Sequence, residues 1–113
     1  MAWEVEVTDE YDAWFLDQSE NGQASIRMKV ELLHEYGPHL PRPHADTLKG
    51  SKLKNLKELR AQTESNIFRI AFIFNKERKA ILLLGGDKKG KNEKSFYRNL
   101  IKQAEEIYKA YNS

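Results

Sequence analysis

The sequence has no cysteine, few prolines and no long apolar run, and each of these absences limits what the protein can be. Without cysteine, neither disulfide bonds nor thiolate metal sites hold the chain together, which is typical of a reducing compartment. No apolar run approaches the roughly 18 residues that a membrane-spanning helix needs. The N-terminal residues MAWEVEV lack the basic start and apolar middle of a signal peptide. We therefore expect a cytoplasmic protein with no membrane partner.

The length and the charge distribution indicate one small domain with a basic half. A chain of 113 residues is long enough for one modest core, so we expect a single domain over residues 1–113. Residues 1–48 carry ten acidic and three basic side chains, whereas residues 49–113 carry seven acidic and sixteen basic ones. Such a basic half suits a polyanion, of which nucleic acid is the commonest in a cell, although a solvated lysine-rich surface has the same composition.

The N-terminal half predicts one strand and two helices. Valine alternates with glutamate around Val5, which is the pattern of a short strand with one covered face. An amphipathic helix capped by Thr8 or Asp9 follows, and a second helix should end at Gly37, which precedes a proline. Residues 38–55 contain all three prolines and show no sustained periodicity, so we expect an extended surface loop.

The C-terminal half predicts three strands and a helix. The strands should cover residues 56–62, 67–74 and 79–85, because the connectors TESN and NKER between them are short and polar, as in antiparallel hairpins. A final amphipathic helix should begin near Asn92 or Ser95. The order β-α-α-β-β-β-α predicts an α+β fold, with an antiparallel sheet, helices packed on one face and the other face partly open.

The strand IFRIAFIF carries one arginine in its middle. Alternation places Arg69 on the face opposite the bulky residues Phe68, Ile70, Phe72 and Phe74, which we expect to meet the helices. The small Ala71 beside Arg69 leaves room for a ligand. A guanidinium in the centre of a sheet needs a carboxylate, a bound anion or water, because its burial alone is costly. An ordinary ion pair with Glu58 or Asp87 is the alternative interpretation.

The neighbouring strand LKELRAQ offers partners for this arginine. If Leu59 lies in the core, Glu58 and Arg60 both face away from it. Pairing of the two strands would then bring Glu58, Arg60 and Arg69 into one patch, which could bind an anion beside a proton acceptor. Lys57 is the alternative facing residue.

The stretch GGDKKGK follows the last predicted strand. Gly85 and Gly86 allow a sharp exit from the strand or the close approach of a ligand. The turn after them should deliver its lysines to the rim of the open face, next to Arg69. Tyr97 follows on the final helix, and we expect it to point away from Leu100, free to stack on a base or to bond a phosphate. A half-buried structural aromatic is the alternative for Tyr97.

Other site chemistries have little support in the sequence. The three histidines, His34, His39 and His44, lack the spacing of metal ligands, so we expect no metal and no other cofactor. The GGDKKGK stretch matches neither a phosphate-binding P-loop nor the dinucleotide fingerprint.

Several blocks, taken together and in this order, resemble the phage-derived HigB-like branch of the RelE/ParE toxin superfamily. They are PRPHADTLKGSKLKNLKELR, IFRIAFIF, AILLLGGDKKG and the aromatic–tyrosine pair that opens the final helix. The resemblance extends over essentially the whole chain and implies a small RelE-like fold. It also implies the toxin of a type II toxin–antitoxin system, which cleaves messenger RNA on the ribosome and is silenced by a cognate antitoxin, a HigA-like helix-turn-helix protein.

The resemblance also implies a metal-independent mechanism in which the RNA's own 2′-hydroxyl attacks the neighbouring phosphorus. This reaction needs a base, cations around the developing charge and a proton donor for the 5′-oxygen. The family's transition-state arginine corresponds to Arg69, its late aromatic residue to Tyr97, and its basic residue after the last strand to Lys88 or, as second choice, Lys91. Glu58, or a Lys57 with a shifted pKa, is the candidate base, with Arg60 beside it. Contact with RNA is expected from Lys49, Lys52, Lys54, Lys57, Lys89, Lys91 and Lys94.

A second function from another class stays open at this point. The ParE-like branch of the same superfamily consists of non-catalytic toxins that inhibit a protein target such as DNA gyrase. An RNA-binding domain without toxicity is a third possibility. The clustered cations together with Tyr97 favour the nuclease.

Overall fold

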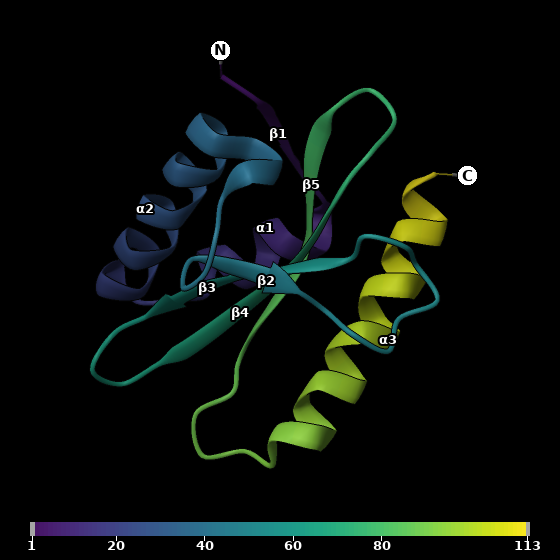
Figure 1. Cartoon of the computed structure of the whole chain (residues 1–113). Coiled ribbons are helices and arrows are strands. Elements are labelled where there is room, and N and C mark those ends of the chain that lie inside the picture. Colours follow the sequence, from purple (N-terminus) through teal and green to yellow (C-terminus); the bar gives the residue numbers. More distant parts are fainter. Residues whose placement is uncertain (1, 113) are drawn as a thin grey trace.

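A computed structural model describes residues 2–112 and shows a five-stranded sheet with three α-helices (Figure 1). The strands are β1 (Glu4–Val7), β2 (Ala45–Thr47), β3 (Lys57–Gln62), β4 (Ile67–Phe74) and β5 (Lys79–Asp87). The helices are α1 (Asp9–Leu16), α2 (Glu20–Tyr36) and α3 (Glu93–Tyr111), with a short 3-10 helix, η1 (Gly37–His39), after α2. The predicted α+β class is confirmed.

Each α-helix begins at a side chain that caps its first turn. Thr8, Ser19 and Asn92 accept hydrogen bonds from backbone N–H groups three residues further on, at the starts of α1, α2 and α3. Helix α2 ends at Gly37, whose φ of 55° is left-handed. A Cβ atom at this glycine would also lie 2.4 Å from the ring of Trp3, so both the backbone and the packing exclude a side chain.

The sheet is mixed, which corrects the prediction of an antiparallel sheet. Its strand order is β1-β5-β4-β3-β2, and β1 runs parallel to β5, whereas the other neighbours are antiparallel. The hairpins that join β3, β4 and β5 were predicted from their short connectors. The place of β1 depends on its pairing with β5. The two strands are far apart in the sequence, so no short connector between them predicts the pairing.

One strand lies in the segment that was predicted to be a loop. Strand β2 pairs with β3, and its register sets Asp46 opposite Glu58 and Thr47 opposite Lys57. Three residues are too few to show an alternating pattern, which is why the sequence did not indicate the strand. The pairing places an acidic side chain beside the predicted anion site.

The helices cover both faces of the sheet, and the prediction of one covered face is wrong. Helices α1 and α2 share one core with Phe68, Ile70 and Phe72, which are fully buried. Helix α3 forms a second core on the other face, against Ala71 and Ile73. Figure 1 shows α3, in yellow, apart from α1 and α2. The alternate positions of β4 are themselves apolar on both sides, and each side needs a cover. The part of the second face near Arg69 stays open.

None of the helices within residues 2–112 combines the length and the apolar character that spanning a bilayer requires.

Candidate functional site

A buried carboxylate lies at the centre of the polar side chains on the α3 face. Glu58 is 3% exposed, and both of its oxygens have partners. Oε1 accepts a hydrogen bond of 2.8 Å from the Tyr97 hydroxyl and lies 3.5 Å from Nε of Arg69. Oε2 accepts bonds of 3.1 and 3.0 Å from Nε and Nη2 of Arg60. We call these four residues the Glu58 cluster, and it confirms that β3 turns Glu58 and Arg60 away from Leu59.

The two arginines of the cluster are cross-strand neighbours. Arg60 on β3 pairs directly with Arg69 on β4. Like charges in this position repel, so the pair depends on the carboxylate between them. Arg69 is the more enclosed, with a side chain 12% exposed against 31% for Arg60, and it also donates to the carbonyl of Phe68. Burial lowers the pKa of Arg60, but the hydrogen bond and charge of Glu58 raise it, with a net upward shift.

Tyr97 closes the cluster from α3. Its hydroxyl donates to Glu58 and accepts a hydrogen bond of 3.1 Å from Nε of Arg69. Burial and the bond to Glu58 raise the pKa of Tyr97 to about 12, so the hydroxyl stays protonated at neutral pH. The prediction that Tyr97 points away from Leu100 is wrong, because both pack against the same core. Residues three apart on a helix share a side, which the sequence interpretation missed.

Lys88 reaches the cluster from the turn after β5. Its backbone N–H bonds to the carbonyl of Ile67, which holds the start of the turn against β4. The ammonium forms an ion pair with Glu93 on the first turn of α3 and lies 5.5 Å from the centre of the Tyr97 ring. The hydrogen bond from Lys88 lowers the pKa of Glu93. The prediction that this turn brings a lysine next to Arg69 is thus confirmed for Lys88.

Asp46 belongs to the same group, although the sequence interpretation did not select it. Its Oδ2 lies 3.3 Å from Nη2 of Arg60 and 2.8 Å from Nη2 of Arg42. The hydrogen bonds from Arg42 and from the backbone of Thr47 lower the pKa of Asp46. The signal that could have found it is the pairing of β2 with β3, which the three residues of β2 do not reveal.

These side chains line one cavity of about 490 Å³. All five residues predicted to be catalytic line it, namely Glu58, Arg60, Arg69, Lys88 and Tyr97. Thr47, Leu48, Lys49, Glu93, Ile101 and Asp46 complete the wall. The cavity therefore places two guanidiniums, two ammoniums, a phenol and three carboxylates around a space open to a ligand.

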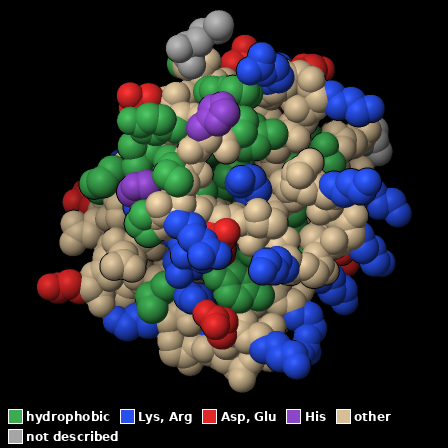
Figure 2. All heavy atoms as spheres, in the orientation of Figure 1, with side chains coloured by type: hydrophobic (Ala, Val, Ile, Leu, Met, Phe, Trp, Pro, Cys, Tyr) green, Lys and Arg blue, Asp and Glu red, His purple; other side chains and the backbone are tan. Residues whose placement is uncertain are grey.

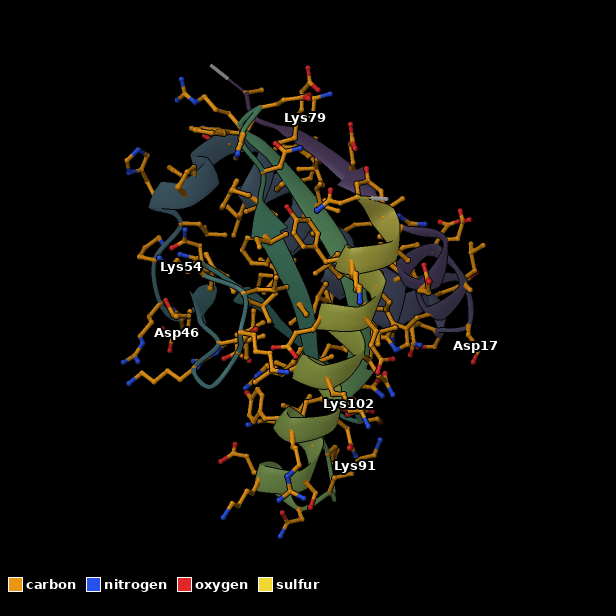
Figure 3. All side chains as sticks on the ribbon, turned by 90° about the vertical axis from the view of Figure 1, so that its right-hand side faces the viewer. Asp17, Asp46, Lys54, Lys79, Lys91 and Lys102 are labelled. Atoms are coloured by element: carbon orange, nitrogen blue, oxygen red, sulfur yellow. The ribbon has the colours of Figure 1, made fainter. Side chains whose placement is uncertain are left out.

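The predicted RNA-contacting lysines are more widely spread. Lys49 lines the cavity. Lys57 leaves β3 on the side opposite Glu58, since neighbouring residues of a strand alternate. Lys89 is exposed and donates to the backbone carbonyl of Glu64. Figure 3 places Lys54 in the loop before β3, on the same side of the molecule as Asp46, and Lys91 near the start of α3, apart from Asp46.

The remaining two of these lysines are exposed as well. Lys52 lies beside the C-terminal half of α3, and Lys94 lies in its first turn. In Figure 2, Lys and Arg side chains gather along the side of α3, and another group lies over β2 beside a carboxylate. The basic surface thus extends from the cavity along α3.

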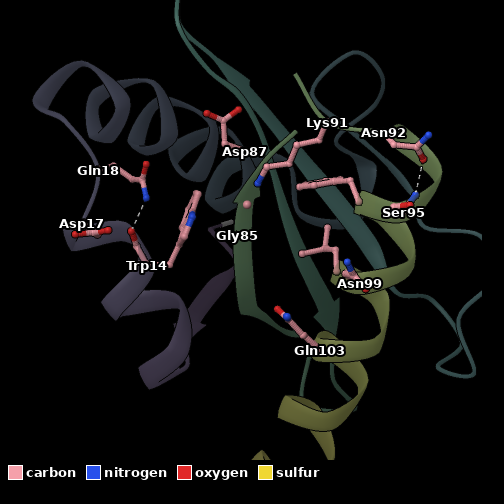
Figure 4. A pocket seen from close by; sticks show the side chains of 13 residues that line it. Trp14, Asp17, Gln18, Gly85, Asp87, Lys91, Asn92, Ser95, Asn99 and Gln103 are labelled. Carbon is pink, nitrogen blue, oxygen red and sulfur yellow. Dashed lines mark hydrogen bonds between the residues drawn. The ribbon is translucent and has the colours of Figure 1, made fainter. Parts of the chain in front are cut away.

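The two glycines at the end of β5 have a packing explanation. A Cβ atom on Gly85 would lie 2.3 Å from the ring of Trp14, and one on Gly86 would lie 3.0 Å from Phe96. Figure 4 shows the groove of about 720 Å³ beside them, with Trp14 on one wall and Asn99 on the other. The glycines therefore give room to aromatic rings from α1 and α3. Lys91 lines this groove and not the cavity around Arg69, which disfavours it as a substitute for Lys88.

Comparison of the sequence with known proteins identifies a family and relatives that agree with one another. The family described as phage derived protein Gp49-like matches residues 13–109. The candidate toxin HigB3 of Mycobacterium tuberculosis is 41% identical over 90% of this chain and 87% of its own length. The candidate toxin HigB2 of the same organism is 36% identical over 96% of this chain and 53% of its own length.

Solved structures give the same fold. A double arginine-to-alanine variant of the Escherichia coli toxin RelE superposes with a TM-score of 0.63 at 13% identity, over 91% of this chain and 97% of that one. The toxin–antitoxin complex RelBE2 from M. tuberculosis contains a chain with a TM-score of 0.59 at 13% identity, over 77% of this chain and 99% of that one. At such identities the likeness shows a shared fold and carries no residue of the site from those proteins to this chain.

Proposed function

The chain belongs to the Gp49-like family of phage-derived proteins and is a HigB-like toxin of the RelE superfamily, and from this premise we propose that it is a ribosome-dependent messenger RNA endoribonuclease. The observation that supports this most strongly is the cavity in which Arg60, Arg69, Lys88 and Tyr97 surround a buried Glu58. Such a set can bind a phosphodiester and also move a proton.

The proposed reaction is the attack of an RNA 2′-hydroxyl on the adjacent phosphorus, with departure of the 5′-oxygen. Negative charge grows on the non-bridging oxygens in the transition state, and fixed cations stabilise it. Arg69 suits this role because β4, two hydrogen bonds and the ion pair with Glu58 hold its guanidinium in place. Arg60 lies opposite and can share the charge. Guanidinium groups match the geometry of phosphate better than ammonium groups do.

Glu58 is the proposed acceptor of the 2′-hydroxyl proton, through Tyr97. The phenol already donates to Oε1 of Glu58. When the Tyr97 oxygen receives the 2′-hydroxyl proton, its own proton passes to Glu58, so the phenol stays neutral throughout. A raised pKa of Tyr97 is consistent with a group that relays a proton without losing its own.

Lys88 is the proposed proton donor for the departing 5′-oxygen. Its ammonium lies on the same cavity wall and is oriented by Glu93. An ammonium group has protons to donate and no lone pair to accept one, which fits donation and not abstraction. Bound RNA would compete with Glu93 for the Lys88 ammonium or share it, because this ion pair lies near the surface.

The proposed partners are the ribosome, messenger RNA and a cognate antitoxin. The similar RelBE2 chain was solved in complex with its antitoxin, and this chain has the same fold. We expect the antitoxin to be a HigA-like helix-turn-helix protein. We also expect a cytoplasmic location, where translated messenger RNA is found.

The test is primer extension on messenger RNA from cells that express the chain. New 5′ ends within translated codons are expected, and they should disappear when translation of that message is blocked. Intact transcripts together with an induced DNA-damage response would overturn the nuclease and support inhibition of a protein such as DNA gyrase.

A further inference from the structure

A second hollow shares Arg60 and Arg69 with the cavity. It has a volume of about 290 Å³ and is lined by Lys29, Pro43, Arg60, Ala61, Gln62 and Arg69. We call it the Lys29 hollow, because Lys29 of α2 is the residue that distinguishes it from the cavity. Helix α2 packs over β3, and Lys29 lines the same hollow as the two arginines.

The lining of the Lys29 hollow includes no acidic residue, although Arg60 and Arg69 are paired with Glu58 on the side of the cavity. Three of its six lining residues are basic and none is acidic. The cavity has four basic residues, Lys49, Arg60, Arg69 and Lys88, but also three acidic ones. The lining of the Lys29 hollow is therefore more favourable for an anion than the lining of the cavity.

Lys29 itself has no carboxylate partner among residues 2–112 within the 4.0 Å of an ion pair. Its Nζ lies 2.7 Å from Nδ1 of His44, and an ammonium can only donate, so Nδ1 is the acceptor of this bond. The carbonyl of His44 in turn accepts from the backbone N–H of Arg60 at 2.8 Å. Lys29 is thus linked through His44 to the backbone of Arg60.

Partial burial of Lys29 is unfavourable in the free protein. Desolvation lowers its pKa, and no acidic group compensates for the lost hydration. A bound anion would supply the missing partner. Because Arg60 and Arg69 belong to both spaces, an anion in the Lys29 hollow lies next to one in the cavity.

We propose that the Lys29 hollow binds the phosphate that neighbours the scissile phosphate along the RNA chain. The proposal rests on the proposed function, since it takes the cavity as the place of the scissile phosphate. Lys29 then acts as a positioning residue: it fixes the direction of the RNA strand across the two arginines. The ligand class is a single-stranded nucleic acid with at least two consecutive phosphates.

The experiment compares two short ligands that cannot be cleaved. A 2′-O-methyl dinucleoside monophosphate has one phosphate, and the corresponding trinucleoside diphosphate has two. The intact chain should bind the longer ligand about tenfold more tightly, as expected for one charge-assisted contact. Lys29→Gln should bind both ligands with nearly equal affinity. Arg27→Gln is the matched control on the same helix, because Arg27 lies over the Phe15 ring, and it should keep the difference.

A second measurement separates the strand from a free ion and from the function. With a longer 2′-O-methyl RNA, Lys29→Gln should reduce the slope of log K against log salt by about 0.7. If Lys29→Gln leaves the trinucleotide preference and this slope unchanged, the proposal is wrong, even where messenger RNA is still cut in cells. Binding of inorganic phosphate that depends on Lys29 without any effect on RNA would also overturn it. If messenger RNA is not cut but Lys29→Gln still reduces the trinucleotide preference and the salt slope, the proposed nuclease function alone is wrong.

Discussion

Arg60 and Arg69 lie directly opposite each other on β3 and β4, and the single carboxylate of Glu58 contacts both. Two adjacent guanidiniums repel each other. Asp46 also contacts Arg60 but pairs with Arg42 as well, so three guanidiniums share two carboxylates. The free protein therefore keeps an excess positive charge at a fixed place in the sheet. A phosphate that arrives there meets groups that are already oriented, which is the condition for strong transition-state stabilisation.

Glu58→Gln should destabilise the protein and abolish cleavage. The amide keeps the shape of the side chain but removes the negative charge that reduces the repulsion between the two arginines. We expect the free energy of unfolding to fall by about 1–3 kcal/mol, the usual cost when a buried charged partner is lost. Urea denaturation measures it, with the exposed Glu64→Gln as control. Added sulfate should restore part of the loss in Glu58→Gln. If Glu58→Gln is as stable as the parent whether or not sulfate is added, this account is wrong.

Arg69→Ala should reduce cleavage on the order of 10², as is typical when one charge-stabilising group is removed. Arg69→Lys should recover little of it, because an ammonium cannot make the paired contacts of a guanidinium. Single-turnover cleavage on programmed ribosomes measures both variants. Lys109→Ala, an exposed position in the last turn of α3, is the control and should cleave normally. Equal activity of Arg69→Ala and the parent would remove Arg69 from the proposed site.

The residues of the site were predictable where they follow strand alternation. Period two on β3 and β4 was enough to place Glu58, Arg60 and Arg69 together. Two contributions were not predictable in this way. Asp46 lies on a strand of only three residues, whose pairing is decided by its neighbour. Lys29 comes from α2, whose sequence has an ordinary amphipathic pattern. The packing of α2 on β3, which this pattern does not specify, places the lysine in the same hollow as the arginines.

The fold shows the same division between local and long-range signals. The hairpins and the capped helices follow from short patterns. The parallel pairing of β1 with β5 joins Glu4 to Lys79, and no local pattern encodes such a distance along the chain. The second covered face has a similar cause, since Ala71 and Ile73 are apolar enough for a core but were interpreted as an open surface.

Asp46→Asn should strengthen RNA binding and slow cleavage. Removal of the negative charge reduces repulsion of the phosphates at the cavity rim. It also frees Arg60 from one of its two carboxylates, so the guanidinium is less well positioned. The expected result is a lower KM together with a lower kcat. Asp17→Asn, near the other groove, provides the comparison. If binding and cleavage both weaken, Asp46 is needed for RNA contact and the repulsion argument fails.

Gly85→Ala should destabilise the protein by about 1–3 kcal/mol through overpacking. The added methyl group would lie 2.3 Å from the Trp14 ring, which is itself packed on Phe68. Gly86→Ala should cost less, because its contact with Phe96 is 3.0 Å and the ring is at the surface of α3. Thermal unfolding of both variants gives the order. The reverse order would show that the groove around Trp14 adapts more easily than the structure indicates.

Alkaline pH should reveal the bond between Tyr97 and Glu58. The pKa of Tyr97 is raised from 10.0 to about 12, so the native state holds this proton where the unfolded state releases it. Above the unfolded pKa the unfolded chain therefore binds fewer protons than the native one, and stability falls as pH rises. The stabilising contribution is complete below about pH 10 and is lost as pH rises toward about pH 12. Tyr11 behaves in the same direction, with its pKa raised to about 12 mainly by burial.

Tyr97→Phe isolates the contribution of the hydroxyl, because it keeps the ring against α3's core. The loss of stability between pH 10 and 12 should become shallower than in the parent, and the phenolate absorbance should lose one late-titrating group. Tyr36→Phe, at an exposed position, is the control and should leave the loss of stability between pH 10 and 12 as in the parent. If Tyr97→Phe removes an early group instead, the hydroxyl is not held by Glu58 in solution. The proton relay would then lose its first step, while the charge arrangement of Arg60 and Arg69 would remain.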